Sequence, residues 1–366
     1  MHLLRCCPAL SIAGSLIAFC MATTAATAAE KEAPGGNGRN PKVEEAVKKG
    51  VEFLLAQQKP DGAIHTGNHP TAMTALALLA MAAVGCLPGD DNDVGEAARK
   101  ALEFLLRDDR QNAEGYFGID GSRMYGHGIV TLLLAELHGM GKTPQDDSRL
   151  RERLEKAVAL CLRAQAVPKD PNHAGGWRYE PGSGDSDLSV TIWHLLALRA
   201  ARNAGLLVAK EAIDKAVAYL KKTYHSPRDA DGKPTNLKSG CAYQPGGGPT
   251  YQSAAAGLLA LQLCGEYEAP EVVGSADFLR EIKINPNADF FYYGSYYYSQ
   301  GMYQRGGEYA THGRQVIEDL LLPRQQTDGS WRGAGGHEAG AGPVYSTAMA
   351  ILSLSVQYHY LPIYQR

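Results

Sequence analysis

Pairs of helical segments recur along most of this chain at a nearly constant spacing. In each pair, an amphipathic segment precedes a segment that is apolar on almost every side. Residues 43–55 place Val, Ala and Leu on one helical face, whereas residues 71–84 are apolar all round. Equivalent positions are 55, 56, 59 and 60 residues apart, and they are Ala46, Ala101, Ala157, Ala216 and Ala276. This regularity predicts a repeat architecture, because a single helix pair cannot bury its apolar face alone.

The apolar segments decide between an open and a closed arrangement of the repeats. There are six of them, at residues 71–84, 127–137, 189–205, 253–265, 296–305 and 345–358. An open solenoid would leave one helix layer in water, whereas a closed ring buries every apolar helix on the inside. We therefore predict an all-α fold over residues 42–366, an (α/α)6 toroid of six inner and six outer helices.

The first 41 residues differ in composition from the repeats. Residues 1–29 combine Arg5, an apolar run at 10–21 and small residues at 26–29, which is typical of a cleaved secretory signal peptide. The apolar run is too short to span a bilayer, so we expect export, periplasmic or secreted, without stable membrane insertion. Residues 30–41 are polar and rich in Gly and Pro, which predicts a disordered linker.

Charge and cysteine content narrow the partners and cofactors. The net charge is −3 with no long basic run, which argues against a nucleic-acid partner. After signal cleavage four cysteines remain, none in a CxxC pair, and three of them sit in or beside apolar helices. They are Cys86, Cys161, Cys241 and Cys264. We predict no cofactor and no metal, although the disulfide state and a gathering of histidines in space stay open.

A glutamine, a glycine and a large apolar residue follow several of the amphipathic segments. The groups are Gln58, Gly62 and Ile64; Gln326, Gly329 and Trp331; and a stretched form with Gln165, Gly176 and Trp177. They resemble the QW motif of the squalene cyclase and protein prenyltransferase repeat family, over about residues 42–360. The resemblance implies a toroid with an apolar lumen, in which these turns tie outer helices to neighbouring inner helices.

Two acids stand at the start of the third apolar segment. Asp185, Ser186, Asp187 and Leu188 resemble a truncated form of the cyclase motif Asp-x-Asp-Asp, whose middle acid protonates an alkene. By position that acid is Asp187, but Leu188 stands where the third acid would be. A carboxyl group in an apolar lumen has a raised pKa and can donate a proton. The competing interpretation is that Asp187 is the N-cap of the inner helix.

Other side chains at or near the starts of the apolar segments are candidate ligand contacts. A tyrosine-rich stretch at 290–303 supplies part of this set, since aromatic faces can grip an apolar chain, a sugar or a cation. With Asp185 and Asp187 as candidate catalytic acids, the predicted substrate-binding residues are Tyr125, His127, Trp193, Gln252, Tyr298, Gln300 and Tyr345. The competing interpretation is a stiff aromatic rim without a ligand.

Three functions remain from the sequence. We favour an exported binding protein that holds an apolar small molecule, a peptide or a glycan at the lumen mouth. The alternative is an acid-initiated squalene or terpene cyclase that uses Asp187. A third is a carbohydrate-active enzyme pairing Asp185 or Asp187 with Glu308 or Glu338, because glycosidases use paired carboxylates.

Overall fold

Twelve helices alternate between two concentric layers in the computed structural model, which describes residues 40–141, 143–358 and 361–364. The outer helices are α1 (Pro41–Ala56), α3 (Asp93–Leu105), α5 (Pro144–Ala166), α7 (Lys210–Thr223), α9 (Pro270–Glu281) and α11 (Gly307–Leu321). The inner helices are α2 (Pro70–Ala82), α4 (Arg123–Leu137), α6 (Leu188–Asn203), α8 (Tyr251–Leu263), α10 (Phe291–Arg305) and α13 (Pro343–Leu354). Within the described residues, extended backbone pairs only as isolated bridges, so the all-α prediction is confirmed.

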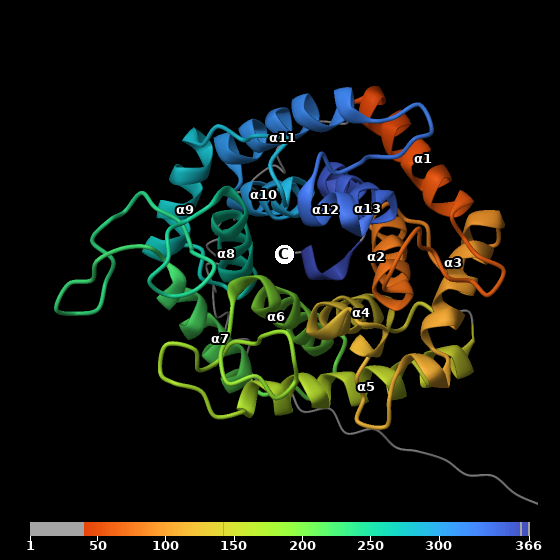
Figure 1. Ribbon diagram of the computed structural model, residues 1–366, viewed down its shortest axis with the longest axis horizontal. Helices are drawn as coiled ribbons and strands as arrows, with labels where there is room; N and C mark the ends of the chain where they lie inside the picture. Colours follow the sequence, from red (N-terminus) through yellow and green to blue (C-terminus); the bar gives the residue numbers. More distant parts are fainter. Residues whose placement is uncertain (1–39, 142, 359–360, 365–366) are drawn as a thin grey trace, which may run out of the picture. The chain divides into compact units, whose positions relative to one another are not determined.

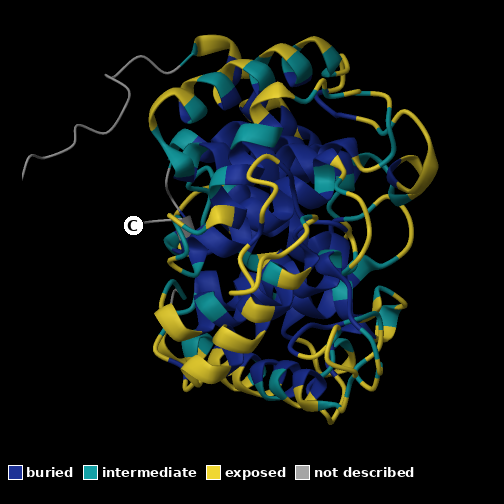
Figure 2. Ribbon diagram, turned by 90° about the vertical axis from the view of Figure 1, so that its left-hand side faces the viewer, coloured by how far each residue is buried: buried dark blue, intermediate teal, exposed yellow. Residues whose placement is uncertain are grey.

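The inner helices close on themselves. Each contacts the next along the chain, and α13 contacts α2, so residues 40–358 form a ring with the outer helices around it (Figure 1). Inner helices are buried nearly all round, whereas outer helices bury one face and expose the other (Figure 2). The predicted (α/α)6 toroid is therefore the observed architecture. A short helix α12 (Gly336–Ala341) is added before α13.

A repeated hydrogen-bonded turn joins each outer helix to the next repeat. In four repeats a glutamine Nε2 donates to the carbonyl of the glycine four or ten residues later, and to a carbonyl on the next outer helix. The pairs of acceptors are Gly62 and Ala97 for Gln58, Gly115 and Arg153 for Gln111, Gly175 and Ala212 for Gln165, and Gly329 and Ala46 for Gln325.

Each of these glycines is required by its surroundings. All four have positive φ, between +84° and +99°, and a Cβ atom would lie 2.2–2.4 Å from a backbone oxygen of the next outer helix. The turn then ends on a large apolar residue whose N–H donates to a side chain of the following inner helix. The donor and acceptor pairs are Ile64 and Thr74, Phe117 and His127, Trp177 and Thr191, and Trp331 and Thr347.

Two details of the predicted turns are wrong. The sixth-repeat glutamine is Gln325, whose side chain bonds Gly329 and Ala46. The side chain of Gln326 is exposed and bonds the nearby Arg324 carbonyl. In the third repeat the glycine that accepts from Gln165 is Gly175, not Gly176. A further turn at Gln111 and Phe117 was missed, because its aromatic residue is Phe.

Inner-helix boundaries also differ from the sequence prediction. The second inner helix begins at Arg123 and the fifth at Phe291, four and five residues before the predicted starts at 127 and 296. Helix α1 begins at Pro41, one residue before the predicted toroid boundary. The predicted signal peptide and almost all of the predicted linker lie outside the described residues. Among the residues described, no helix is both long and apolar enough for a bilayer crossing.

The two neighbouring glutamines of the sixth repeat provide a stability test. Gln325→Ala removes the two hydrogen bonds that the glutamine amide donates to the carbonyls of Ala46 and Gly329, and so breaks the side-chain link between the last repeat and α1. We expect the free energy of unfolding in urea to fall by about 2 kcal/mol. The matched control Gln326→Ala should change it by less than about 0.5 kcal/mol, because that side chain is exposed. Equal effects would contradict the role of Gln325.

Candidate functional site

Asp187 ends the long loop before α6 and is the N-cap of that helix. Its Oδ1 accepts hydrogen bonds from the N–H of Val190 at 2.9 Å and from the Ser189 hydroxyl at 2.6 Å. Its own N–H donates to the Trp177 carbonyl, which closes the loop into a bridge. The structure therefore shows the cap that was one of the two interpretations of Asp187.

The second carboxylate oxygen of Asp187 lies in a different environment. Oδ2 faces Nη1 of Arg178 at 3.5 Å, and neither of these buried atoms makes a hydrogen bond within the described structure. The Asp187 side chain is fully buried, and this burial raises the pKa of its carboxyl group. Hydrogen bonds from Ser189 and Val190, the charge of Arg178 and the Tyr243 hydroxyl oppose the rise. The facing atoms of Arg178 and Asp187 are thus buried and have open hydrogen-bonding capacity.

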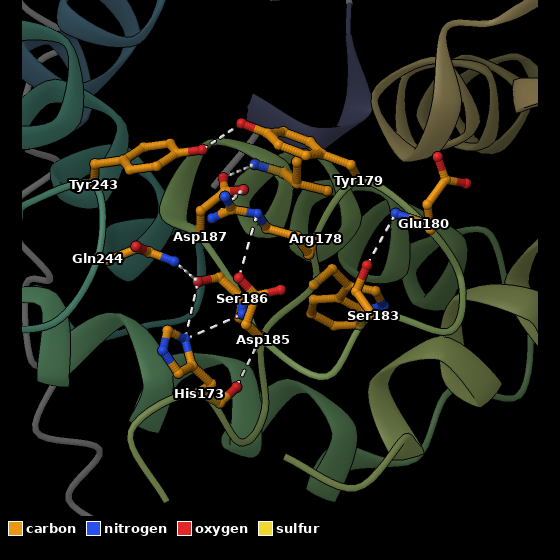
Figure 3. A network of polar contacts seen from close by, with 12 residues as sticks. His173, Arg178, Tyr179, Glu180, Ser183, Asp185, Ser186, Asp187, Tyr243 and Gln244 are labelled. Carbon is orange, nitrogen blue, oxygen red and sulfur yellow. Dashed lines mark hydrogen bonds and ion pairs between the residues drawn. The ribbon is translucent and has the colours of Figure 1, made fainter. Parts of the chain in front are cut away.

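Arg178 is held between aromatic rings. Its guanidinium carbon lies 4.5 Å from the centroid of Tyr179 and 5.6 Å from that of Tyr243, and its Nε lies 3.6 Å from Asp185. The hydroxyls of Tyr179 and Tyr243 meet at 2.5 Å beside the Arg178–Asp187 pair (Figure 3). Tyr243 is 40% exposed, whereas Asp187 is fully buried, so solvent reaches the tyrosine pair but not the acid.

The loop that carries Tyr243 comes from the next repeat and is bonded to the Asp187 loop. The Tyr243 carbonyl accepts from the N–H of Leu188, and Gln244 Nε2 donates to the Ser186 carbonyl at 3.0 Å. Ser186 in turn bonds His173, so the two loops form one hydrogen-bonded surface (Figure 3). This surface lies at the end of the ring where the inner helices begin, as predicted for the lumen mouth.

Two further tyrosines lie near the same carboxylate, Tyr125 and Tyr293, and Tyr345 lies near both of them. The Tyr125 hydroxyl bonds the Ser189 hydroxyl at 2.5 Å, and its ring lies 5.8 Å from that of Tyr179. Burial, and then the charge of Asp187, raise the pKa of Tyr125. Burial is also the main cause of the raised pKa values of Tyr293 and Tyr345, with Asp187 adding to the first and Glu338 to the second.

Glu338 on α12 is a second buried carboxylate at this end of the ring. Its two oxygens accept from the N–H groups of Tyr292 and Tyr293, at 3.1 and 2.9 Å, and so cap the start of α10. Burial raises the pKa of Glu338 to about 7. Glu308, the other predicted glutamate partner, is exposed at the start of α11 and pairs with Arg280.

The remaining predicted site residues lie elsewhere. His127 is fully buried in the second turn of α4. Trp193 stacks on Tyr296, and Tyr298 packs against Tyr251, both within the buried core. Gln252 donates to the Asp289 carbonyl, and Gln300 is buried within α10. Of the predicted set, the structure thus brings Asp185, Asp187, Tyr125 and Tyr345 into one neighbourhood.

Sequence reasoning missed Arg178, Tyr179, Tyr243 and Tyr293. Arg178 directly follows the Trp of a recognised turn, so its place at the mouth of the ring could have been inferred. Tyr293 was obscured by the misplaced start of α10. The approach of Tyr243 has no local signal, because 56 residues separate it from Asp187 in the chain.

Comparisons with known proteins show the fold and leave the family open. No family model matches this chain, and no curated protein matches it. One similar structure is an inactive variant of the alpha-1,6-mannanase GH76A of Salegentibacter sp. HEL1_6 in complex with alpha-1,6-mannotriose. Its TM-score is 0.61, and its sequence is 11% identical over 87% of this chain and 99% of the mannanase chain.

Two other solved structures share the architecture. The type II terpene cyclase MstE from Scytonema has a TM-score of 0.56 and 14% identity over 88% of this chain and 100% of that one. A mutant of Rex8A from Paenibacillus barcinonensis, complexed with an arabinofuranosyl-xylotetraose, has a TM-score of 0.57 and 13% identity over 90% of this chain and 94% of that one. Identities this low support the toroid fold alone, so membership of the squalene cyclase family stays a prediction.

The raised pKa of Glu338 predicts a pH dependence of stability. The folded state keeps the proton up to about pH 7, whereas the unfolded state loses it near the ordinary value of 4.5. The stabilisation is therefore complete below pH 4.5 and is lost as the pH rises, at about 1.4 kcal/mol per pH unit. Urea denaturation between about pH 4.5 and 8 should show a flatter profile for Glu338→Gln than for the unmodified protein. Glu308→Gln is the exposed control and should keep the slope, and identical profiles for all three proteins would contradict the prediction.

Proposed function

We propose that this end of the ring binds a glycan chain, with Arg178 and Asp187 as its polar contacts and Tyr179 and Tyr243 as its aromatic contacts. The observation that carries the proposal is the 3.5 Å pair of Arg178 Nη1 and Asp187 Oδ2, buried and without hydrogen bonds in the described part of the chain. Buried polar atoms of this kind cost free energy unless a ligand or water satisfies them. A sugar hydroxyl fits both atoms, because it donates to a carboxylate oxygen and accepts from a guanidinium.

The aromatic residues support the same class of ligand. Tyr179 and Tyr243 combine a flat apolar face with a hydroxyl, and ligand sites use this combination for molecules with both apolar and polar surface. The two tyrosine hydroxyls must move apart to admit a ligand beside the ion pair. Tyr243 is partly exposed, so its side chain can move at a small cost in free energy. Two of the similar toroid structures are complexes with oligosaccharides, which adds support by analogy.

A cyclase acting on isoprenoids is the second candidate. The raised pKa of Asp187 and the stacked rings of Trp193 and Tyr296 favour it, since such a reaction needs a protonated acid and aromatic walls. Against it, the Ser189 and Val190 hydrogen bonds are donated to the Asp187 carboxylate, and Arg178 stabilises the ionised form. Proton transfer to an alkene needs the protonated acid, which these contacts disfavour. Binding of a glycan uses Asp187 in the state that these contacts favour.

Calorimetric titration with alpha-1,6-linked manno-oligosaccharides and arabinoxylan oligosaccharides tests the proposal. Asp187→Asn keeps a good N-cap and removes the charged acceptor, so affinity should fall by about tenfold or more. Tyr243→Ala should weaken binding about fivefold through lost ring contact. Tyr309→Ala is the matched control, because Tyr309 also lies beside arginines but on the outer helix α11, and it should leave affinity unchanged.

The same proteins separate the alternatives. Release of shorter oligosaccharides during the titration would place the site among glycan-cleaving enzymes and keep the ligand class. Cyclic products from squalene or geranylgeranyl substrates, lost in Asp187→Asn, would replace the glycan proposal by the cyclase. Absence of binding to every oligosaccharide of the panel would contradict the glycan proposal.

A further inference from the structure

Three metal-ligating side chains meet in the core, away from the Asp187 surface. His127 on α4, Cys161 on α5 and His194 on α6 are all fully buried, and one ligand atom from each lies within 4.8 Å of the other two. No other such group of three occurs among the described residues. The His127 and His194 rings lie 5.9 Å apart, and Trp177 stacks on His194 at 5.3 Å.

The other repeats show that the fold does not need these residue types. His127 accepts the turn N–H of Phe117, a task that Thr74, Thr191 and Thr347 perform in other repeats. Cys161 offers its carbonyl to the Trp177 indole, as Leu321 does to Trp331. His194 lies three residues after Thr191, where the other repeats have Ala77 after Thr74 and Ala350 after Thr347. Side chains that can bind a metal thus meet in space at positions where other repeats have Thr, Leu and Ala.

The hydrogen bonds identify which atoms are open for a ligand. His194 Nδ1 lies 3.0 Å from the Val190 carbonyl and therefore carries the proton. Its Nε2 is then a lone-pair acceptor, and it is buried with no hydrogen-bond partner in the described structure.

His127 has the opposite arrangement. The Phe117 N–H points at Nδ1 from 3.3 Å, so the proton is on Nε2, which lies 3.1 Å from the Ala157 carbonyl and 3.4 Å from Cys161 Sγ. A ring N–H beside a sulfur stabilises a thiolate, and outer hydrogen bonds of this kind tune metal affinity. His127 therefore acts as a donor to the sulfur, and Cys161 and His194 are left as the ligands.

We propose that Cys161 Sγ and His194 Nε2 bind one monovalent copper ion, with His127 as the hydrogen-bond donor to the sulfur. Metal bonds of about 2.3 Å to sulfur and 2.0 Å to nitrogen, the lengths found at zinc, span up to about 4.3 Å. The ligand atoms of the cluster lie within 4.8 Å of one another, so at most a small side-chain movement brings them into that range. On binding, the Cys161 S–H bond is exchanged for an S–Cu bond, the proton goes to solvent, and no atom changes oxidation state.

Charge and donor type select this ion. A thiolate with Cu⁺ is neutral, so the complex can remain in a dry core, where an uncompensated charge is costly. Zinc with one thiolate would leave a positive charge, and it requires four ligands, whereas the described cluster contains no carboxylate. Thiolate sulfur and imidazole nitrogen are both donors that suit copper.

Metal analysis of the refolded full chain tests the proposal. The protein is refolded with buffered Cu⁺ under reductant and then separated from free ion. We expect about one copper per chain, with sulfur and nitrogen ligands in X-ray absorption at the copper edge. Cys161→Leu and His194→Ala use the residues of the other repeats, so both variants should fold, and both should lose the copper. Cys241→Ser is the matched control, because Cys241 is also fully buried but lies outside the His127–Cys161–His194 cluster, and it should keep the ion.

The variant His127→Thr tests whether His127 is a hydrogen-bond donor to the sulfur or a ligand of the copper ion. Thr retains an acceptor for the Phe117 N–H, and we expect copper to remain with about tenfold weaker affinity. Complete loss in this variant would overturn the role assigned to His127. Failure of the unmodified chain to retain copper, an absorption spectrum without sulfur, or retention of copper by Cys161→Leu would overturn the site itself. The X-ray absorption spectrum of the unmodified chain tests the copper site even if a variant does not fold.

Discussion

The ring depends on a glutamine amide that bridges two backbone carbonyls. An amide group has two N–H donors, and in four repeats one side chain uses its nitrogen to bond the turn that follows its own helix and the outer helix of the next repeat. The partner glycine must be Gly, because its φ is positive and the next helix passes at 2.2–2.4 Å from where a Cβ would be. The spacing between neighbouring outer helices is therefore set by this backbone contact. The positions of the apolar inner helices depend on that spacing.

The chemistry of the lumen mouth arises from the same construction. Six inner helices begin at one end of the ring, and each beginning leaves backbone N–H groups that need acceptors. Asp120 accepts from the start of α2, Asp187 from α6 and Glu338 from α10, so acids gather there for a structural reason. Asp187 differs from the others because its second oxygen faces the half-buried Arg178 instead of another N–H. The proposed function gives this capping residue a second role as a ligand contact.

Periodicity was sufficient to predict the fold, because the difference between amphipathic and apolar helices contains the information about inside and outside. Boundaries failed where that signal was weak. Helix α10 is rich in tyrosine, which is amphipathic, and its start is capped by Glu338 from helix α12, which is distant in the sequence. His127 was assigned to the rim because an apolar run begins there, yet α4 starts four residues earlier and its second turn faces the core. The Arg178–Asp187–Tyr243 group could not be predicted, since it requires two loops from different repeats.

The bond from Gln325 to Ala46 joins residues 279 positions apart, and Asn40 and Glu318 are joined across 278. An open array of repeats can fold from any point as its neighbours appear. This ring cannot, because α1 rests against a helix of the last repeat and must wait until nearly the whole chain has been synthesised. Contacts of such high sequence separation slow folding and leave apolar helices exposed in the meantime. Helix α1 is therefore among the last to find its partner, and assembly of the ring ends at the seam where its first and last repeats meet.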